Sequence, residues 1–474
     1  MRPSITCFGL SLILVAVLAG PLLGEETKKF GEIGGDDPGE AAAPQSIYKP
    51  RPAPRLRLTL QQCLDAAAIN NREIRGKQYD VDIANWKLEE ATRAFYPVMD
   101  YEYNLAPAPK DASAAVSSLA SGDLTVFNRM RIGLGIPLTT FGKISNAQDL
   151  ARGNIVVNEQ DQRKKKQEVV SQIHQIYYGI LLGKEMDHLL GAARERLQEE
   201  IATREAKAED EEAAPVDPQE VLKLKVFLFL VDQRLDELFK KMEVGYEALK
   251  VQLGLDPQLE IDVAEEHLKP VKRTFAELET IKEEALLHRP EARQLEAGIQ
   301  LARDNYELEM HKLAPDLGFG GFFEMGRAPG VTGTGSQNDF TDPFNFTRAG
   351  VGFRLQGQFD WKGSKAKIKQ AELTWKKADY QREYARSGIA LDVSDAYWNV
   401  KNNWAQVERT REAQKLSRQL LFLAQSNIDI GLGSGSDLME GIQAFMLARS
   451  KYFEAVFDYN VSVAKLDQKT GRDE

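Results

Sequence analysis

The histidines and cysteines of this chain lack the spacings that metal binding or nucleophilic catalysis requires. There are five histidines and two cysteines, and no two histidines stand in a pair such as H-x-x-x-H, which would put both imidazoles on one helix face. His174 lies beside Tyr177 and Tyr178 on a predicted helix face, a position typical of a packed or interface histidine. These residues therefore predict neither a metal site nor a bound cofactor.

The other motifs with chemical meaning also point away from an enzyme. The sequence contains no G-x-S-x-G motif, no paired-cysteine motif and no P-loop. Its many carboxylates follow predicted helix surfaces, where solvated side chains are the norm. The glycines of GLGSGSD (431–437) do not match G-x-G-x-x-G and follow no strand, so they indicate a tight turn rather than a phosphate site. We assign no catalytic residue.

The elements around these residues belong to an exported, acidic protein. The chain has 474 residues, a net charge of −10 and a pI of about 5.4, which disfavours nucleic-acid binding. Residues 1–24 resemble a signal peptide, with Arg2 before the apolar run LSLILVAVLAG, and no other stretch reaches the ~18 apolar residues of a transmembrane helix. Residues 25–57 are predicted to form an extended segment, and Cys63 then has no partner for an intrachain disulfide.

The chain is predicted to contain two structural repeats. NNREIR (71–76) aligns with RPEARQ (289–294) at an offset of 218 residues, and FGKISNAQDLA aligns with WKGSKAKIKQA at an offset of 220. Further matches keep the same order along the chain, which indicates duplication. We place the first repeat at 58–254, a linker or equatorial segment with a short strand near Ile261–Val263 at 255–274, and the second repeat at 275–471.

Each repeat is predicted to combine a helix, a β-hairpin and long helices. The first helix has about 35 residues and ends at a proline, Pro97 or Pro315. Very long helical patterns follow the hairpins, and about 60 helical residues span roughly 90 Å. The predicted bounds are about 97–138 and 315–359 for the hairpins, and about Ile144–Lys207 and Ser364–Asp429 for the long helices.

Four stretches, each of about ten residues, alternate between apolar and polar side chains. One of them is RMRIGLGIPL (129–138), in which every second residue is apolar. This length and period are typical of transmembrane β-strands, whose apolar side chains face lipid and whose polar side chains face the lumen. We expect lumen-facing side chains at Asp100, Glu102, Arg129, Arg131, Arg348 and Arg354, and lipid-facing side chains at Met130, Ile132, Leu134 and Phe353.

An ordinary antiparallel sheet over a soluble core is the alternative interpretation. The long flanking helices, the mid-strand arginines and carboxylates and the aromatic residues of the apolar face count against it. Four strands cannot close a barrel, and lipid does not tolerate open strand edges, so copies of the chain must share one barrel. Two copies would supply eight strands around a filled interior, and three would supply twelve around an aqueous lumen.

The order of these motifs resembles that of the TolC-like outer-membrane efflux family over about residues 58–471. The resemblance is carried by the twofold repeat, by LTLQQCLDAAAINNREIR and its counterpart IKEEALLHRPEARQ, by ALDVSDAYWNV, and by NIDIGLGSGSDLMEGIQAFMLARSKYFEA and LDQKTG. It implies a mainly α-helical chain with a transmembrane β part. It also implies a homotrimer, whose twelve-stranded β-barrel in the outer membrane continues into a periplasmic α-helical barrel.

The function that the resemblance implies is a passive outer-membrane duct of a tripartite efflux or type I secretion system. An inner-membrane pump of RND, ABC or MFS type would deliver substrates through a periplasmic adaptor protein. The sequence does not separate small-molecule efflux from protein secretion. The competing hypothesis is a secreted structural coiled-coil protein with a soluble β-sheet, which would be recovered without detergent.

The resemblance places adaptor contacts at two periplasmic tips. GLGSGSD matches the family's glycine-containing turn, where Asp437 begins the returning helix and suits an N-cap. The other tip, KAEDEEAAPVDPQE (207–220), departs from the family's pattern because it is longer, acidic and without glycine, and it is either a solvated turn or a specific adaptor contact. The candidate contact residues are Glu211, Pro215, Asp217, Gly431, Gly433, Ser434 and Asp437.

Overall fold

The computed structural model describes residues 56–209, 218–332, 334, 341–357, 360–430, 432 and 435–472. The described residues all belong to one unit of the chain, Ile47–Glu474. The predicted signal peptide and all but the end of the predicted extended segment lie outside the described residues.

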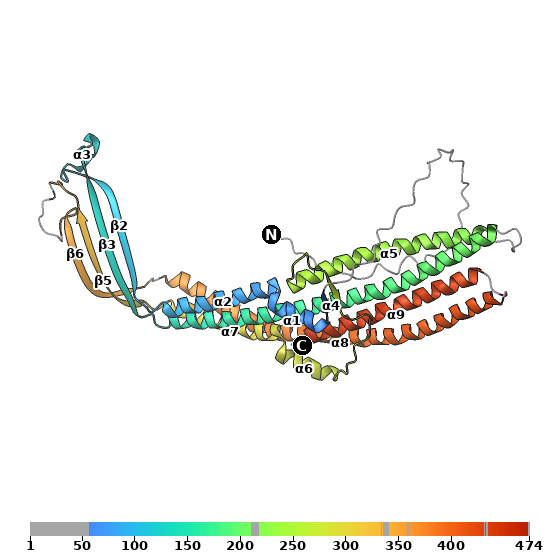
Figure 1. Ribbon diagram of the computed structural model, residues 1–474. Helices are drawn as coiled ribbons and strands as arrows, with labels where there is room; N and C mark the ends of the chain where they lie inside the picture. The colour runs from blue at the N-terminus through green and yellow to red at the C-terminus, as the bar shows by residue number, and fades with distance from the viewer. Residues whose placement is uncertain are drawn as a thin grey trace, which may run out of the picture. The chain divides into compact units, whose positions relative to one another are not determined.

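Most of this unit is helical (Figure 1). The long helices α4 and α8 lie within three residues of their predicted bounds at each end. The helices of the first half are α1 (Leu60–Asn70), α2 (Arg72–Arg93), α3 (Ala115–Ser121), α4 (Lys143–Glu209) and α5 (Pro218–Leu253). Those of the second half are α6 (Leu278–His288), α7 (Pro290–His311), α8 (Trp361–Asp429) and α9 (Gly435–Thr470).

The first helix of each half is broken, which corrects the prediction of one continuous helix. Asn71 has an extended backbone (φ −61°, ψ 126°), and its side chain accepts from the amides of Glu73 and Ile74, so it ends α1 and caps α2. In the second half Arg289 is extended because Pro290 follows it, and a proline disfavours the helical conformation in the residue before it. Hydrophobic periodicity continues across both breaks, so the pattern alone did not locate them.

The alternating stretches form one antiparallel sheet in the order β2-β3-β5-β6. Helix α3 stands between β2 and β3, where the sequence predicted only a loop. A second, parallel pair joins β1 to β4, and β4 occupies the residues predicted for a short strand. The strands are β1 (Leu56–Leu58), β2 (Val98–Pro109), β3 (Leu124–Thr139), β4 (Ile261–Val263), β5 (Asp316–Arg327) and β6 (Phe346–Gln356).

The helices pack in two connected layers. Helix α2 lies against α4, α4 against α7, and α7 against α8; further along, α5 and α9 both lie against α4, and α9 also lies against α8. The main core forms where these helices meet α1, α6 and β4, with Tyr177, Leu249 and Val456 almost fully buried. Within the described helices, none has an apolar stretch long enough to cross a membrane.

Candidate functional site

The strand register brings the predicted polar side chains onto one face of the sheet. Glu102 lies opposite Arg131, Arg131 opposite Glu324, and Glu324 opposite Arg348. Directly opposed residues of neighbouring strands share a face. The result is a row of alternating charge across all four strands, which we call the charged row (Glu102, Arg131, Glu324 and Arg348).

One ion pair and one ring contact fix two members of the charged row, Glu324 and Arg348. The Nε of Arg129 lies 2.6 Å from Oε1 of Glu324, which is only 8% exposed. Arg348 lies over the ring of Phe346 at 4.1 Å. Its guanidinium also donates a hydrogen bond to the carbonyl of Asp342. Glu324 was not among the predicted lumen residues, although its place in an alternating stretch was the signal that could have found it.

A glycine makes room for the carboxylate of Asp100 on the same face. A Cβ on Gly133, the residue opposite Asp100, would lie 2.5 Å from its Oδ1. Any side chain at position 133 would therefore displace this carboxylate. Arg354 shares the face as well, opposite Gly318. All six predicted lumen residues thus lie on one face of the sheet, which also carries Phe322, the residue that breaks the alternation of β5.

The opposite face of the sheet is apolar and largely exposed in the single chain. Met130, Ile132, Leu134 and Phe353 all lie on it, as the alternation predicts. Phe353 is 75% exposed, and its ring centroid lies 5.3 Å from that of Phe319. An apolar surface this continuous is rare on a soluble monomer and marks a contact with lipid or protein.

The predicted tip residues are mostly outside the described residues. Glu211, Pro215, Asp217, Gly431, Gly433 and Ser434 all fall there. Asp437 is described, and its predicted role as N-cap is wrong. Helix α9 begins at Gly435, so Asp437 lies in the first turn, where a carboxylate interacts favourably with the helix dipole.

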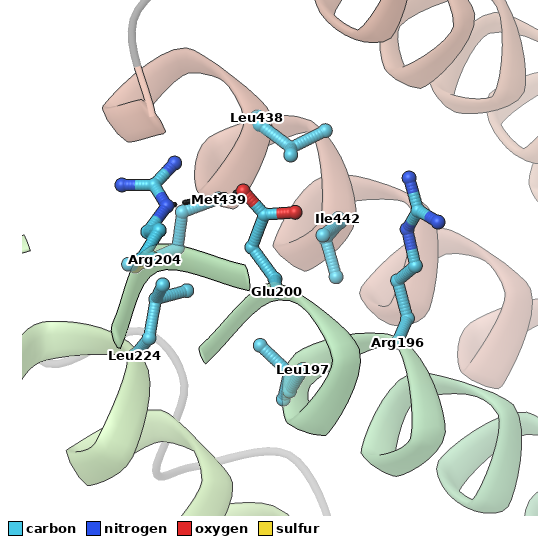
Figure 2. Close-up of a pocket in the computed structure, with 8 residues that line it drawn as sticks. All are labelled: Arg196, Leu197, Glu200, Arg204, Leu224, Leu438, Met439 and Ile442. Carbon is cyan, nitrogen blue, oxygen red and sulfur yellow. Dashed lines mark hydrogen bonds and ion pairs between the residues drawn. The ribbon is translucent and has the colours of Figure 1, made fainter. Parts of the chain in front are cut away.

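The two long hairpins pack against each other near these tips (Figure 2). Leu197 and Leu224 of the first hairpin pack with Met439 and Ile442 of α9, and both leucines are at most 5% exposed. The space left between them is about 10 Å³, about one water-sized sphere. Sequence reasoning missed this cluster because its members lie far apart in the chain.

Polar contacts surround the apolar cluster. Arg204 forms ion pairs with Glu200 of α4 and with Glu220 of α5, which ties the two helices of the first hairpin together. Arg196 donates from Nη2 to Oε1 of Gln425 at 3.2 Å, which links α4 to α8. These contacts join α4 to α5 and to α8 close to the described ends of the two hairpins.

His174 and Cys63 are packing residues rather than reactive groups. Burial lowers the pKa of His174, whose Nδ1 lies 2.8 Å from the carbonyl of Val170, in agreement with the predicted packed histidine. Cys63 is fully buried, and this burial raises the pKa of its thiol to about 12. Among the described residues, no three His, Cys, Asp or Glu side chains converge to hold a metal ion.

Comparisons with known proteins agree with this geometry. A family model described as outer membrane efflux protein matches residues 63–210 and 281–472. A search of curated proteins found no match. Solved structures of outer-membrane proteins resemble the chain in fold, and those described next are 12–17% identical to it in sequence.

The open state of the MtrE outer membrane channel of Neisseria gonorrhoeae is 16% identical, with a TM-score of 0.70 over 87% of this chain and 88% of that one. The CmeC outer membrane channel of Campylobacter jejuni is 17% identical, with a TM-score of 0.68 over 87% and 85%. The outer membrane protein VceC of Vibrio cholerae is 12% identical, with a TM-score of 0.67 over 87% and 96%.

The family model covers most of the described chain, including α4 and the whole second long hairpin of α8 and α9. Its members are channels rather than enzymes, and a secreted coiled-coil protein is not favoured. The sheet with one apolar and one charged face is the arrangement that a membrane duct requires. The chain therefore belongs to the outer membrane efflux protein family and is an efflux duct of the outer membrane.

Proposed function

We propose that three copies of the chain close a twelve-stranded barrel that continues into a periplasmic α-helical barrel. The observation that carries this proposal is the four-stranded sheet, whose edge strands β2 and β6 have no further partner among the described strands. An open edge in lipid would leave backbone donors and acceptors unsatisfied, at several kcal/mol for each group. Strands from neighbouring copies satisfy both edges, and twelve strands leave room for an aqueous lumen.

The proposal treats the chain as two repeats, 58–254 and 275–471, joined by 255–274, after a signal peptide (1–24) and an extended segment (25–57). Matched helix lengths support it: α1 and α6 have 11 residues each, α2 and α7 have 22, and α5 and α9 have 36. Two repeats in each of three copies would give six similar units around one axis.

In this barrel the charged face of the sheet lines the lumen and the apolar face contacts lipid. The proposed lumen residues are Asp100, Glu102, Arg129, Arg131, Arg348 and Arg354, together with Glu324, and the proposed lipid-facing residues are Met130, Ile132, Leu134 and Phe353. Charged side chains face water at little cost, whereas each of these arginines would cost about 2–4 kcal/mol at the bilayer midplane. This difference in cost supports the assignment.

The periplasmic tips would contact an adaptor protein, which connects the duct to an inner-membrane pump. The acidic first tip (207–220) and the glycine-containing second tip (431–437) lie at the ends of the two hairpins. The energy for transport then comes from the pump, and the duct itself needs no catalytic group. Small molecules and secreted proteins both remain candidate cargoes, and the pump class is RND, ABC or MFS.

The test combines the mass of the purified complex with its conductance. We expect native mass spectrometry in detergent to give a trimer, and planar lipid bilayers to show discrete conductance steps. Adding the cognate adaptor should raise the open fraction. A monomer that is soluble without detergent and does not conduct would contradict the proposal and restore the coiled-coil alternative.

A further inference from the structure

The helical layer of the chain ends on two helices with unpartnered apolar stripes. In the order α2, α4, α7, α8, the edges are α2 and α8. Tyr79, Ile83 and Trp86 of α2 are 67%, 53% and 71% exposed, and their spacing of four and three residues puts them on one helix face. The stripe of α8 consists of Leu373, Tyr380 and Tyr384, which are 55%, 87% and 84% exposed.

Some side-chain contacts of α2 and α4 have counterparts at the corresponding positions of the second half. Gln162 of α4 donates to Gln78 of α2. Adding the sequence offsets of 220 for α4 and 218 for α2 gives Arg382 and Glu296, which form an ion pair at 3.4 Å. The sequence offsets therefore carry a contact of the first half onto a contact that the structure contains, for α4 as well as for α2.

A second set of contacts supports these offsets at the broken helices, together with an offset of 217 that relates α5 to α9. Asn71 donates to Gln252, which in turn donates to Gln172. At the corresponding place in the second half, Arg289 and Lys469 both contact Asp392. The two clusters share their positions although one is neutral and the other is charged.

The interface between α4 and α7 joins the two halves and can be transferred by these offsets. The two helices pack tightly at Gly153, where an added Cβ would lie 2.5 Å from Cδ2 of Leu301. The residue that corresponds to Gly153 is Leu373 of α8, and the residue that corresponds to Leu301 is Ile83 of α2. Both of these residues belong to the exposed stripes.

We infer that α8 of one copy packs against α2 of the next copy with Leu373 opposite Ile83. The inference rests on the proposed trimer and adds the surface and the register by which its copies meet. Two different surfaces meet in this contact, so it is heterologous and generates a closed ring when the rotation closes. Leucine in place of glycine sets α8 and α2 further apart here than α4 and α7.

The chemistry of this interface differs from that of its template. Next to the interface between α4 and α7, Arg163 of α4 donates to the carbonyls of His288, the last residue of α6, and of Gly471, which follows α9, at 2.9 and 3.0 Å. The residue that corresponds to Arg163 is Glu383, and a carboxylate cannot donate to a carbonyl. The interface between copies therefore depends on apolar and aromatic burial more than the interface within the chain does.

Cysteine crosslinking tests the register in assembled protein in native membranes. The double variant Leu373→Cys with Ile83→Cys should form a disulfide between copies on mild oxidation, because a disulfide requires Cα atoms within about 7 Å. We expect a covalent trimer on a non-reducing gel, which reverts to monomer on reduction. Each single variant should stay monomeric, and Cys63 is buried and serves as an unchanged background.

A matched control uses Leu391→Cys with Ile83→Cys. Leu391 is exposed on α8, 18 residues beyond Leu373, which is five full turns and about 27 Å further along the same face. A trimeric, conducting protein that crosslinks through position 391, or through neither position, would overturn the inference and leave the proposed function intact. A protein that is monomeric by native mass would overturn both.

Discussion

The Nε of Arg129 lies 2.6 Å from Oε1 of Glu324, and this ion pair joins β3 of the first half to β5 of the second. Glu324 also stands between Arg131 and Arg348 in the charged row. A single carboxylate thus balances arginines on both sides of it. Because β3 and β5 meet only in the folded chain, the pair helps to set how the two halves join.

Replacing this carboxylate should weaken the sheet. Glu324→Gln keeps the size of the side chain but removes its charge, and hydrogen bonds to charged groups contribute about 1.5–3 kcal/mol. We expect the free energy of unfolding in urea to fall by about 1–2 kcal/mol, because Arg129 is partly solvated and keeps some of its hydration. Arg354→Gln is the control, since the described residues offer Arg354 no ion pair; an equal loss there would contradict the role of Glu324.

The two faces of β3 should respond in opposite ways to a change of charge. Leu134→Arg puts a cation on the apolar face, at a cost of about 2–4 kcal/mol near the bilayer midplane, and should block membrane assembly. Arg131→Gln, three residues away on the charged face, should assemble and at most alter conductance. Outer-membrane fractionation and heat-modifiable migration report assembly, and the reverse pattern would mean that the strand faces the other way.

The acidic tip should contribute to adaptor binding. Reversing the charges of Glu209, Glu211 and Glu212 should weaken site-specific crosslinking to the cognate adaptor while leaving the trimer intact. Glu90→Lys, an exposed acid on α2, is the control for a general change of charge. Unchanged crosslinking and export in the triple variant would show that this tip is only a solvated turn.

Acid should loosen the contact between α8 and the break before α7. Burial acts to raise the pKa of Asp392, but the hydrogen bond from Arg289 and the charge of Lys469 outweigh it and hold the pKa below its usual range. A carboxyl group whose pKa is lower in the folded than in the unfolded chain stabilises the folded state. This stabilisation is fully present above the pKa of the unfolded chain, about 4, and is lost as the pH falls through the pKa of the folded chain.

Asp392→Asn should therefore lower stability at pH 7 and flatten the loss of stability below about pH 4. Urea unfolding at several pH values measures both effects. Asp395→Asn, on the same helix and hydrogen-bonded to Asn399, is the control and should change neither. If Asp392→Asn kept the acid dependence of the wild type, other carboxylates would be responsible for it.

Several features of the fold could be predicted because they are local. Alternation along β3 placed Arg131 and Leu134 on opposite faces, and the strand register agrees. Uninterrupted helical patterns located α4 and α8 within a few residues. The helix breaks at Asn71 and Arg289 and the short helix α3 were missed, since caps and short turns change little in the apolar pattern.

The sequence by itself determined the type and order of the elements, the apolar and polar faces of the strands and the membership of the family. Tertiary structure alone decided which strands pair and in what register. It therefore also decided that Glu324 forms its ion pair with Arg129 rather than with another cation. It also decided that Leu197 packs with Met439 and Ile442 between the hairpins. The physical reason is that periodicity reports which side of an element is apolar, whereas contacts between distant segments depend on the packing of the whole chain.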